Sequence, residues 1–261
     1  MCITALTAVK SDVPTLTHVI PSQGRGGVSA VTSLDDDVFV VRRYSQQVEV
    51  YDAVTFTLQR HIAVSGLGPD TLSMTACARN KCLYLSSYDS LHRVELSGSN
   101  AVKKWSVASG PTGLSVNIAH NLVVACCEAN KLQEYTTHGS LVRDICVTDP
   151  WHAIQLSTGN YVVSQHTSPG VVIVVGVDGL VIHNYGQSQR SDVGQMKHPS
   201  GLAVTKNDDI FVTDWGNNRI LSINRSTGCV QELALSVDSG IQWPRGLCLD
   251  ESRGRLYVGE K

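Results

Sequence analysis

The chain has 261 residues, which suffices for one all-β domain with a full core and leaves no room for a second domain. Its 21 Lys and Arg residues against 23 Asp and Glu residues give a formal net charge of −2, so any nucleic-acid binding would need a local basic patch. Apolar runs such as Val171–Val175 are far shorter than the roughly 20 residues of a membrane-spanning helix, and we expect no membrane contact.

The N-terminal segment predicts two strands, Cys2–Val9 and Leu16–Ile20, ahead of the rest of the fold. The first residues, MCITALTAVK, contain no basic segment and no cleavage site of the secretory type, so we expect no signal peptide and a cytoplasmic protein. The eight cysteines include no CxxC pair and no Cys/His spacing of the zinc type. We therefore expect reduced thiols, most of them buried within strands, and no cofactor.

A proline-anchored unit recurs along the chain. Five of the eight prolines are spaced by 42, 39, 49 and 45 residues, and a glycine lies 42 residues before the first of them; these anchors are Gly27, Pro69, Pro111, Pro150, Pro199 and Pro244. A small or apolar residue follows three positions later, and a second apolar run begins 11 to 14 residues after each anchor. Four short strands repeated every 40 to 50 residues are typical of propeller blades. Helical repeats of similar period would need a 3.6-residue apolar pattern, which this sequence lacks.

The repeat predicts an all-β fold, a six-bladed β-propeller of four-stranded antiparallel blades, in a single domain over residues 1–261. Runs rich in Val, Ile, Tyr and Phe between Gly, Asn and Asp mark the expected strands, as in Val38–Val41, Leu122–Ala125, Tyr161–Ser164 and Ile220–Ile223. The blades are expected at approximately residues 22–66, 67–108, 109–147, 148–196, 197–240 and 241–261, the last completed by residues 1–21.

The last repeat stops after two strands, at Lys261. A propeller left open would expose a sheet edge, which promotes aggregation. The two N-terminal strands have the right size to fill the gap, so we predict a two-plus-two closure in which they form the outer half of blade six. The alternative is that the chain is a fragment of a longer protein.

Several segments resemble NHL repeats. The segments are HPSGLAVTKNDDIFVTDWGNNRILSIN at residues 198–224, WPRGLCLD at residues 243–250 and LYVGE at residues 256–260. The similarity extends over roughly residues 26–261 and is to the six-bladed NHL propellers of tripartite-motif (TRIM-NHL) proteins, although blade two has Asp70-Thr71 where Pro-x-Gly is usual. The resemblance implies that Asp214 and Arg219 tie a loop to a strand.

Loops at one end of a propeller converge on the mouth of its channel, where partners usually bind. Arg and aromatic residues dominate binding energy at interfaces, and this chain places many of them in these loops, although each Trp could instead pack between blades. The predicted partner-binding residues are Arg42, Arg43, Tyr44, Tyr88, Lys131, Trp151, His166, Lys197, Trp215, Asn217, Trp243 and Arg245, with Asn130, Gln165 and His198 in the same loops.

The resemblance implies a protein-interaction platform like the substrate-recognition propeller of tripartite-motif ubiquitin ligases. The RING, B-box and coiled coil that give such ligases their activity are absent, so we expect no enzyme and no ubiquitin transfer by this chain, but a monomer with a protein partner. Single-stranded or hairpin RNA is an alternative ligand of the same face, with Arg and Lys on phosphates and aromatic rings under bases. Another alternative is a metal-dependent lactonase- or lyase-like propeller enzyme that uses His152, His166 and His198.

Overall fold

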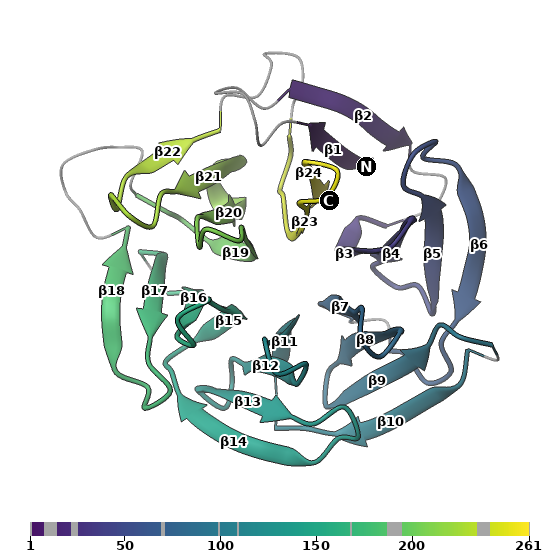
Figure 1. Ribbon diagram of the computed structural model, residues 1–261, viewed down its shortest axis with the longest axis horizontal. Coiled ribbons are helices and arrows are strands. Elements are labelled where there is room, and N and C mark those ends of the chain that lie inside the picture. Colours follow the sequence, from purple (N-terminus) through teal and green to yellow (C-terminus); the bar gives the residue numbers. More distant parts are fainter. Residues whose placement is uncertain are drawn as a thin grey trace.

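The computed structural model describes residues 2–7, 15–21, 26–68, 71–98, 100–108, 110–167, 169–186, 195–233 and 241–260, with residues 2–7 and 15–21 described by their backbone alone. It is an all-β propeller: four-stranded antiparallel sheets are arranged like blades around a common centre (Figure 1). The predicted all-β propeller of four-stranded antiparallel blades is therefore confirmed.

Five blades are each built from four consecutive strands, numbered outward from the centre. Blade one has β3 (Val28–Leu34), β4 (Asp37–Arg42), β5 (Gln47–Asp52) and β6 (Leu58–Ala63). Blade two has β7 (Met74–Cys77), β8 (Cys82–Ser87), β9 (Ser90–Glu95) and β10 (Val102–Ser106). Blade three has β11 (Pro111–Val116), β12 (Leu122–Cys126), β13 (Lys131–Tyr135) and β14 (Leu141–Cys146). Blade four has β15 (Pro150–Gln155), β16 (Tyr161–Gln165), β17 (Val171–Val175) and β18 (Val181–Tyr185). Blade five has β19 (Pro199–Val204), β20 (Ile210–Asp214), β21 (Arg219–Ile223) and β22 (Val230–Glu232), with a single 3-10 turn, η2 (Trp215–Asn217), after β20.

A further four-stranded sheet combines the two ends of the chain. Its strands are β23 (Gly246–Asp250), β24 (Arg255–Gly259), β1 (Cys2–Thr7) and β2 (Thr15–Pro21), in the order β2-β1-β24-β23. Strands β1 and β24 pair antiparallel from Ile3 opposite Gly259 to Thr7 opposite Arg255. Five blades are thus each formed by one continuous stretch of chain. A count of six, as predicted, is reached only if the composite sheet is counted as a blade.

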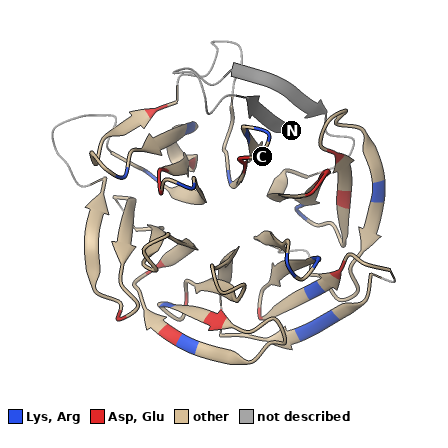
Figure 2. Cartoon of the chain, viewed as in Figure 1, with Lys and Arg blue, Asp and Glu red and all other residues tan. Residues whose placement is uncertain are grey.

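The burial pattern explains which runs are apolar. Strands β8, β12 and β16 are buried at every residue, because neighbouring blades cover both of their faces. The outer strands β6, β14 and β18 are exposed at almost every residue. Lys and Arg mark β6 and β10, and both signs of charge stand side by side on β14 (Figure 2). The outer rim therefore carries no single-sign field.

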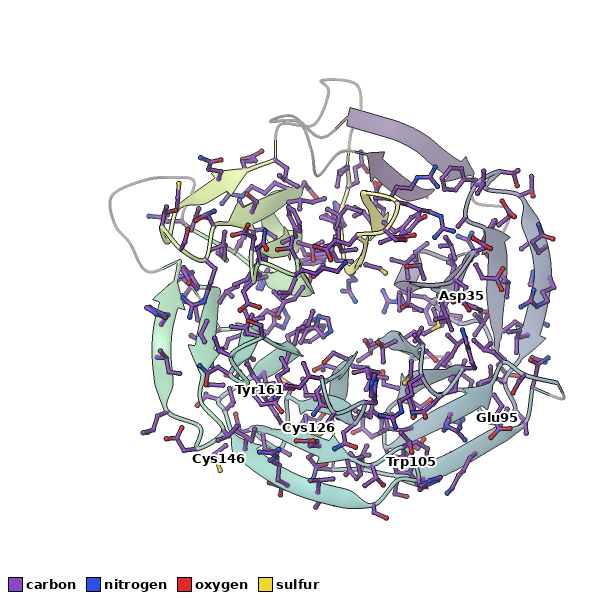
Figure 3. All side chains as sticks on the ribbon, viewed as in Figure 1. Asp35, Glu95, Trp105, Cys126, Cys146 and Tyr161 are labelled. Atoms are coloured by element: carbon purple, nitrogen blue, oxygen red, sulfur yellow. The ribbon has the colours of Figure 1, made fainter. Side chains whose placement is uncertain are left out.

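The cysteines follow the same division. Cys77, Cys82 and Cys126 are buried, and the cysteines from Cys77 to Cys248 are free thiols. Figure 3 shows Cys126 among packed side chains and Cys146 at the outer edge. The prediction of burial is wrong for Cys146 and Cys229, which are exposed. Cys146 ends the outer strand β14, which has no blade beyond it, and Cys229 lies in the turn just before β22. Among the described residues, no helix is long and apolar enough to cross a membrane.

Glycines allow the inner strands to approach one another closely. A Cβ atom on Gly113 would lie 2.4 Å from the carbonyl oxygen of Trp151, and one on Gly201 would lie 2.3 Å from that of Arg245. Both distances are shorter than any real contact, so a side chain at either position would push neighbouring blades apart. The Pro-x-Gly signature therefore marks where blade meets blade at the centre.

Deleting residues 1–21 tests how much the composite sheet contributes. Removal of β1 and β2 leaves β24 as an unpaired edge, so we expect the thermal midpoint to fall by about 10 °C or more and aggregation to increase. Circular dichroism and size-exclusion chromatography measure both effects. A synthetic peptide of residues 1–21 added in trans should restore part of the loss; an unchanged midpoint in the shortened chain would contradict a stabilising role.

Candidate binding site at the channel mouth

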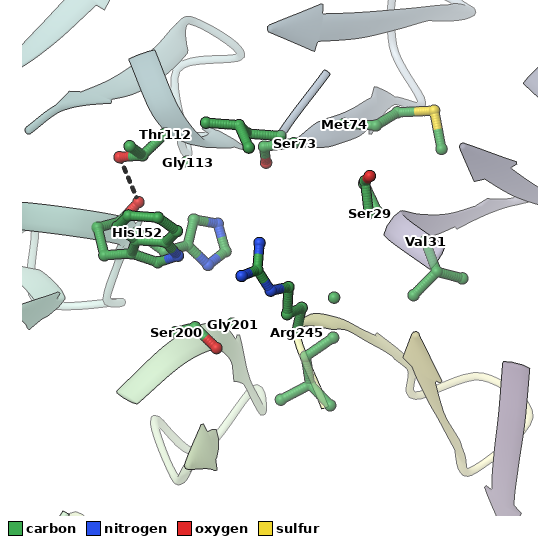
Figure 4. A pocket seen from close by; sticks show the side chains of 15 residues that line it. Ser29, Val31, Ser73, Met74, Thr112, Gly113, His152, Ser200, Gly201 and Arg245 are labelled. Atoms are coloured by element: carbon green, nitrogen blue, oxygen red, sulfur yellow. Dashed lines mark hydrogen bonds between the residues drawn. The ribbon is translucent and has the colours of Figure 1, made fainter. Parts of the chain in front are cut away.

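The inner strands begin at one end of the propeller, which we call the channel mouth. A cavity of about 50 Å³ opens there among residues of all six sheets. Figure 4 shows its wall, with the guanidinium of Arg245 directed into the space. Residues that line it include Ser29, Ser73, Thr112, Trp151, His152, Ser200 and Arg245.

A repeated irregularity shapes this wall. In β3, β11, β15 and β19 the pairing with the second strand shifts just after the first residue of the strand, as between Pro111 and Gly113 or between Pro150 and His152. Such a bulge leaves one residue unpaired and re-aims its side chain. The residue after the proline anchor, Trp151 in blade four and Thr112 in blade three, therefore lines the mouth.

Aromatic rings form a continuous series along the mouth from blade four to the composite sheet. Successive ring centroids are 4.5 Å apart for Trp151 and His166, 4.7 Å for His166 and His198, 5.5 Å for His198 and Trp215, and 5.2 Å for Trp215 and Trp243. All four lie within the range of favourable ring pairs. The sequence proposed all five residues as members of one face, and the structure brings them into contact.

Arg245 closes this series at the centre. Its guanidinium carbon lies 5.3 Å from the Trp215 ring centroid, a cation–π distance. Burial and the nearby Arg43 lower the pKa of Arg245. Within the described residues its guanidinium has no carboxylate or hydrogen-bond acceptor as a partner, which is unusual because buried charges are normally paired.

A groove on the rim adjoins the mouth. It has a volume of about 280 Å³ and lies beside η2. Two buried polar atoms beside it, Nδ1 of His198 and Nε1 of Trp215, have no hydrogen-bond partner among the described residues. The residues that line the groove are Lys197, His198, Trp215, Gly216, Asn218 and Trp243.

Asp214 holds the loop that carries Trp215. Its buried carboxylate accepts hydrogen bonds from the backbone N–H of Lys197 at 2.9 Å and from the amide of Asn217 at 2.7 Å, and it pairs with Nε of Arg219 at 3.0 Å. These are the ties from loop to strand that the NHL resemblance implied. The side chain of Asn217, predicted to bind a partner, thus serves the loop.

His152 is a structural residue that the sequence offered as a possible metal ligand. It occupies the position of the glycine in the Pro-x-Gly signature, and its ring bridges blades three and five. Nε2 donates to the carbonyl oxygen of Leu114 at 3.0 Å, and Nδ1 accepts from the N–H of Leu202 at 3.0 Å. Both partners require the neutral ring, and burial lowers the pKa of His152 from its ordinary 6.5 to about 4.

Other predicted residues divide into engaged and free side chains. Arg42 is buried and forms a two-pronged ion pair with Glu49, at 2.8 and 3.0 Å. Lys131 pairs with Asp144 at 2.9 Å, and Gln165 and Asn130 bond to backbone atoms of the loop before β15.

Tyr44 and Tyr88, by contrast, are 69% and 67% exposed at the tips of their loops. Arg43, 5.5 Å from the Tyr44 ring centroid, and the exposed Lys197 also remain available.

The donor set does not fit a metal. Among the described residues, no group of three or more His, Cys, Asp or Glu side chains is placed to hold one. Both ring nitrogens of His152 are occupied by backbone groups, and a cationic guanidinium stands in the cavity where a metal would lie. The lactonase-like alternative with His152 as a ligand is therefore not supported.

Comparison with known proteins supports the fold at two levels. The NHL repeat family model matches residues 196–221, from just before β19 into β21. A search among curated proteins finds no match. Similar solved structures include virginiamycin B lyase from Staphylococcus aureus, with 11% identity over 99% of this chain and 81% of that chain and a TM-score of 0.65. A streptogramin B lyase has 10% identity over 100% and 98% of the two chains and a TM-score of 0.63. A chain of a nidogen/laminin complex has 9% identity over 94% and 97% and a TM-score of 0.71.

These likenesses correct one expectation and leave another open. The prediction that the chain is not an enzyme is not supported, because a propeller of the same fold is a lyase. The lack of a RING in this sequence bears only on ubiquitin transfer and excludes no other kind of catalysis. Identities of 9 to 11% show the fold alone, and none of these findings links the chain to tripartite-motif proteins.

The low pKa of His152 predicts a specific acid sensitivity. Between pH 6.5 and about 4, His152 is protonated in the unfolded chain but neutral in the folded chain. The contribution of the neutral His152 to folding stability is therefore full above pH 6.5 and is lost as the pH falls to about 4. This gap corresponds to up to roughly 3 kcal/mol.

Urea unfolding at about pH 7 and about pH 4.5 measures this loss. The His152→Gly variant, which gives blade four the glycine that blades three and five have at this position, should be less stable than the natural chain at neutral pH and lose less on acidification. His183→Asn on the exposed face of β18 is the control and should behave like the natural chain. Equal acid losses in the His152 variant and the natural chain would contradict the assignment.

Proposed function

We propose that this chain is an interaction module that binds a protein partner at the channel mouth. The observation that carries the proposal is the continuous series of rings from Trp151 to Trp243, which ends on Arg245. Trp, Tyr and Arg are the residues that contribute most to binding energy. A propeller core needs none of them in its loop tips, so their clustering there favours recognition over packing.

Two further observations support a protein partner. Tyr44, Tyr88 and Trp243 leave large apolar surfaces in water at this end, a property of interaction sites rather than of an isolated surface. One structure of similar fold is a chain of a complex of two proteins, nidogen and laminin. Recruitment of a ubiquitination substrate, as in tripartite-motif ligases, is the more specific form of the proposal; it rests on the sequence resemblance, and the NHL match at residues 196–221 bears only on the repeat itself. A cytoplasmic location and a monomeric state stay predictions.

RNA is a weaker candidate for the same face. Two of the five cations that the sequence offered for phosphates, Arg42 and Lys131, are paired with carboxylates. Arg43, Lys197 and Arg245 remain. Binding of single-stranded nucleic acid usually needs a groove of cations that follows the backbone, so the remaining set favours a compact ligand.

A photo-crosslinking amino acid at two exposed positions tests the proposed function. Tyr44, 69% exposed, lies at the mouth, and Val181, 58% exposed, lies on the outer strand of blade four. We expect protein adducts from position 44 that persist after ribonuclease treatment and are absent from position 181. Replacement of Trp215 by Ala in the Tyr44-labelled chain should reduce their yield. Adducts to RNA alone, or equal protein adducts from both positions, would contradict the proposal.

A lyase-like reaction is a second candidate, favoured by His166. Burial, His198 and Arg245 lower the pKa of His166, so a neutral imidazole stands beside the cavity and can accept a proton. The similar lyase acts on virginiamycin B, as its name states. Incubation with virginiamycin B followed by liquid chromatography tests this candidate: a product formed by the natural chain and lost in His166→Ala would support it. Failure to consume the compound would remove this substrate class, and a product that His166→Ala still forms would remove the role of His166.

A further inference from the structure

We propose that the channel mouth binds a carboxylate of an acidic peptide segment between Arg245 and Arg43, and that the neighbouring apolar or aromatic side chain of the peptide enters the rim groove. This inference rests on the proposed function and specifies its ligand: a segment in which Asp or Glu stands next to a large apolar residue.

The guanidinium of Arg245 carries a charge that no acidic side chain of the described residues compensates. The guanidinium of Arg245 projects into the cavity (Figure 4), and no acidic residue lines that cavity in the described part of the chain. Its guanidinium carbon lies 5.3 Å from the centroid of the Trp215 ring, a contact that supplies no negative charge. A partly buried cation is normally paired, as Arg42 and Arg219 are with Glu49 and Asp214 in this same protein. An anion from outside would supply the missing partner.

A second cation lies near Arg245. Arg43 is close enough to lower the pKa of Arg245 electrostatically. Two neighbouring arginines repel each other, and a carboxylate between them would turn that repulsion into two attractions. Arginine presents planar, paired donors that match the two oxygens of a carboxylate.

The size of the cavity and the position of the rim groove beside it favour a short segment as the ligand. A cavity of about 50 Å³ exceeds the space that one water needs and suits a single small anionic group rather than a length of polymer. Trp215 belongs to both sites, since its ring faces Arg245 and also lines the groove of about 280 Å³. An acidic side chain at Arg245 thus places the next residue of the same peptide over Trp215 and Trp243.

The charge pattern favours a peptide over RNA. The available cations are few. Arg43 and Arg245 interact with each other at the mouth, and Lys197 lines the groove. A phosphate chain would need a succession of such points, whereas an acidic side chain beside an apolar one needs a single cationic site and a single apolar groove.

Selection from a phage-displayed library of random heptapeptides tests the inference without a known ligand. We expect enrichment of Asp or Glu next to Trp, Phe or Leu on the natural chain, and loss of the acidic preference on Arg245→Gln. Arg60→Gln removes the same charge from the exposed face of β6 and should retain the preference. Arg43→Gln, a second variant at a partly exposed position, should weaken it even if Arg245→Gln fails to fold.

Isothermal titration of a selected peptide and its counterpart with amide in place of carboxylate quantifies the effect. The acidic form should bind about tenfold tighter or more to the natural chain and without preference to Arg245→Gln. Enriched peptides without acidic residues, or a preference that survives in both mouth variants, would overturn the inference while the proposed function stands. Binding of a twelve-uridine RNA in place of any peptide would also overturn it. Absence of enriched peptides together with absence of mouth crosslinks would overturn both proposals.

Discussion

The structure depends on the close approach of inner strands at the channel mouth. Gly113 and Gly201 face carbonyl oxygens of the next blade at distances that admit no Cβ atom. Hydroxyl groups also donate to carbonyl oxygens of the next blade: Thr112 to Trp151 at 2.8 Å, Ser164 to Ser200 at 2.7 Å and Thr213 to Arg245 at 3.2 Å. Because these contacts join blades rather than strands within a blade, they set the angle at which each blade meets the next.

Blade four meets this constraint in another way. His152 has the bulk that glycine avoids, and it points its ring across the channel wall to a carbonyl of blade three and an N–H of blade five. The neutral imidazole supplies one donor and one acceptor, which is what these two backbone groups need. The bridge stiffens the side of the ring that carries Trp151 and His166. A binding surface built of ring contacts benefits from that stiffness, since less freedom is lost when a ligand arrives.

The repeat and its consequences could be predicted from the sequence, because proline spacing and apolar runs are local features. The third and fourth strands of blade five show where strand prediction fails. Strand β21 is a clear apolar run, whereas β22 is short and polar and has no apolar pattern that would predict a strand. Arg42 and Arg43 show it again. They are adjacent and chemically equal, yet Arg42 ends a strand and turns toward Glu49 while Arg43 begins the loop. Which neighbour faces the core follows from strand register, and register depends on partners far away in the sequence.

The ring contacts across three sheets could not be predicted from the sequence either, because they too depend on residues far apart in the chain. Trp151, His166 and Trp243 are separated by up to about ninety residues, and only the circular arrangement of blades makes them neighbours. The same holds for the unpaired charge of Arg245, since a lone arginine after a proline resembles any surface cation until its surroundings are known.

Division of labour within the Pro-x-Gly signature explains how one fold can carry unlike functions. The glycine is fixed by the approach of backbones, and the proline begins the strand. The side chain of the residue between them lines the mouth. That position holds Thr112, Trp151, Ser200 and Arg245, four side chains with different chemistry. Thr112 and Ser200 are buried and hydrogen-bonded within the ring of blades, whereas Trp151 and Arg245 contribute to the ring series at the mouth. A propeller can therefore vary the chemistry of its mouth at positions like these two, which is consistent with lyases and a protein complex among structures of similar fold.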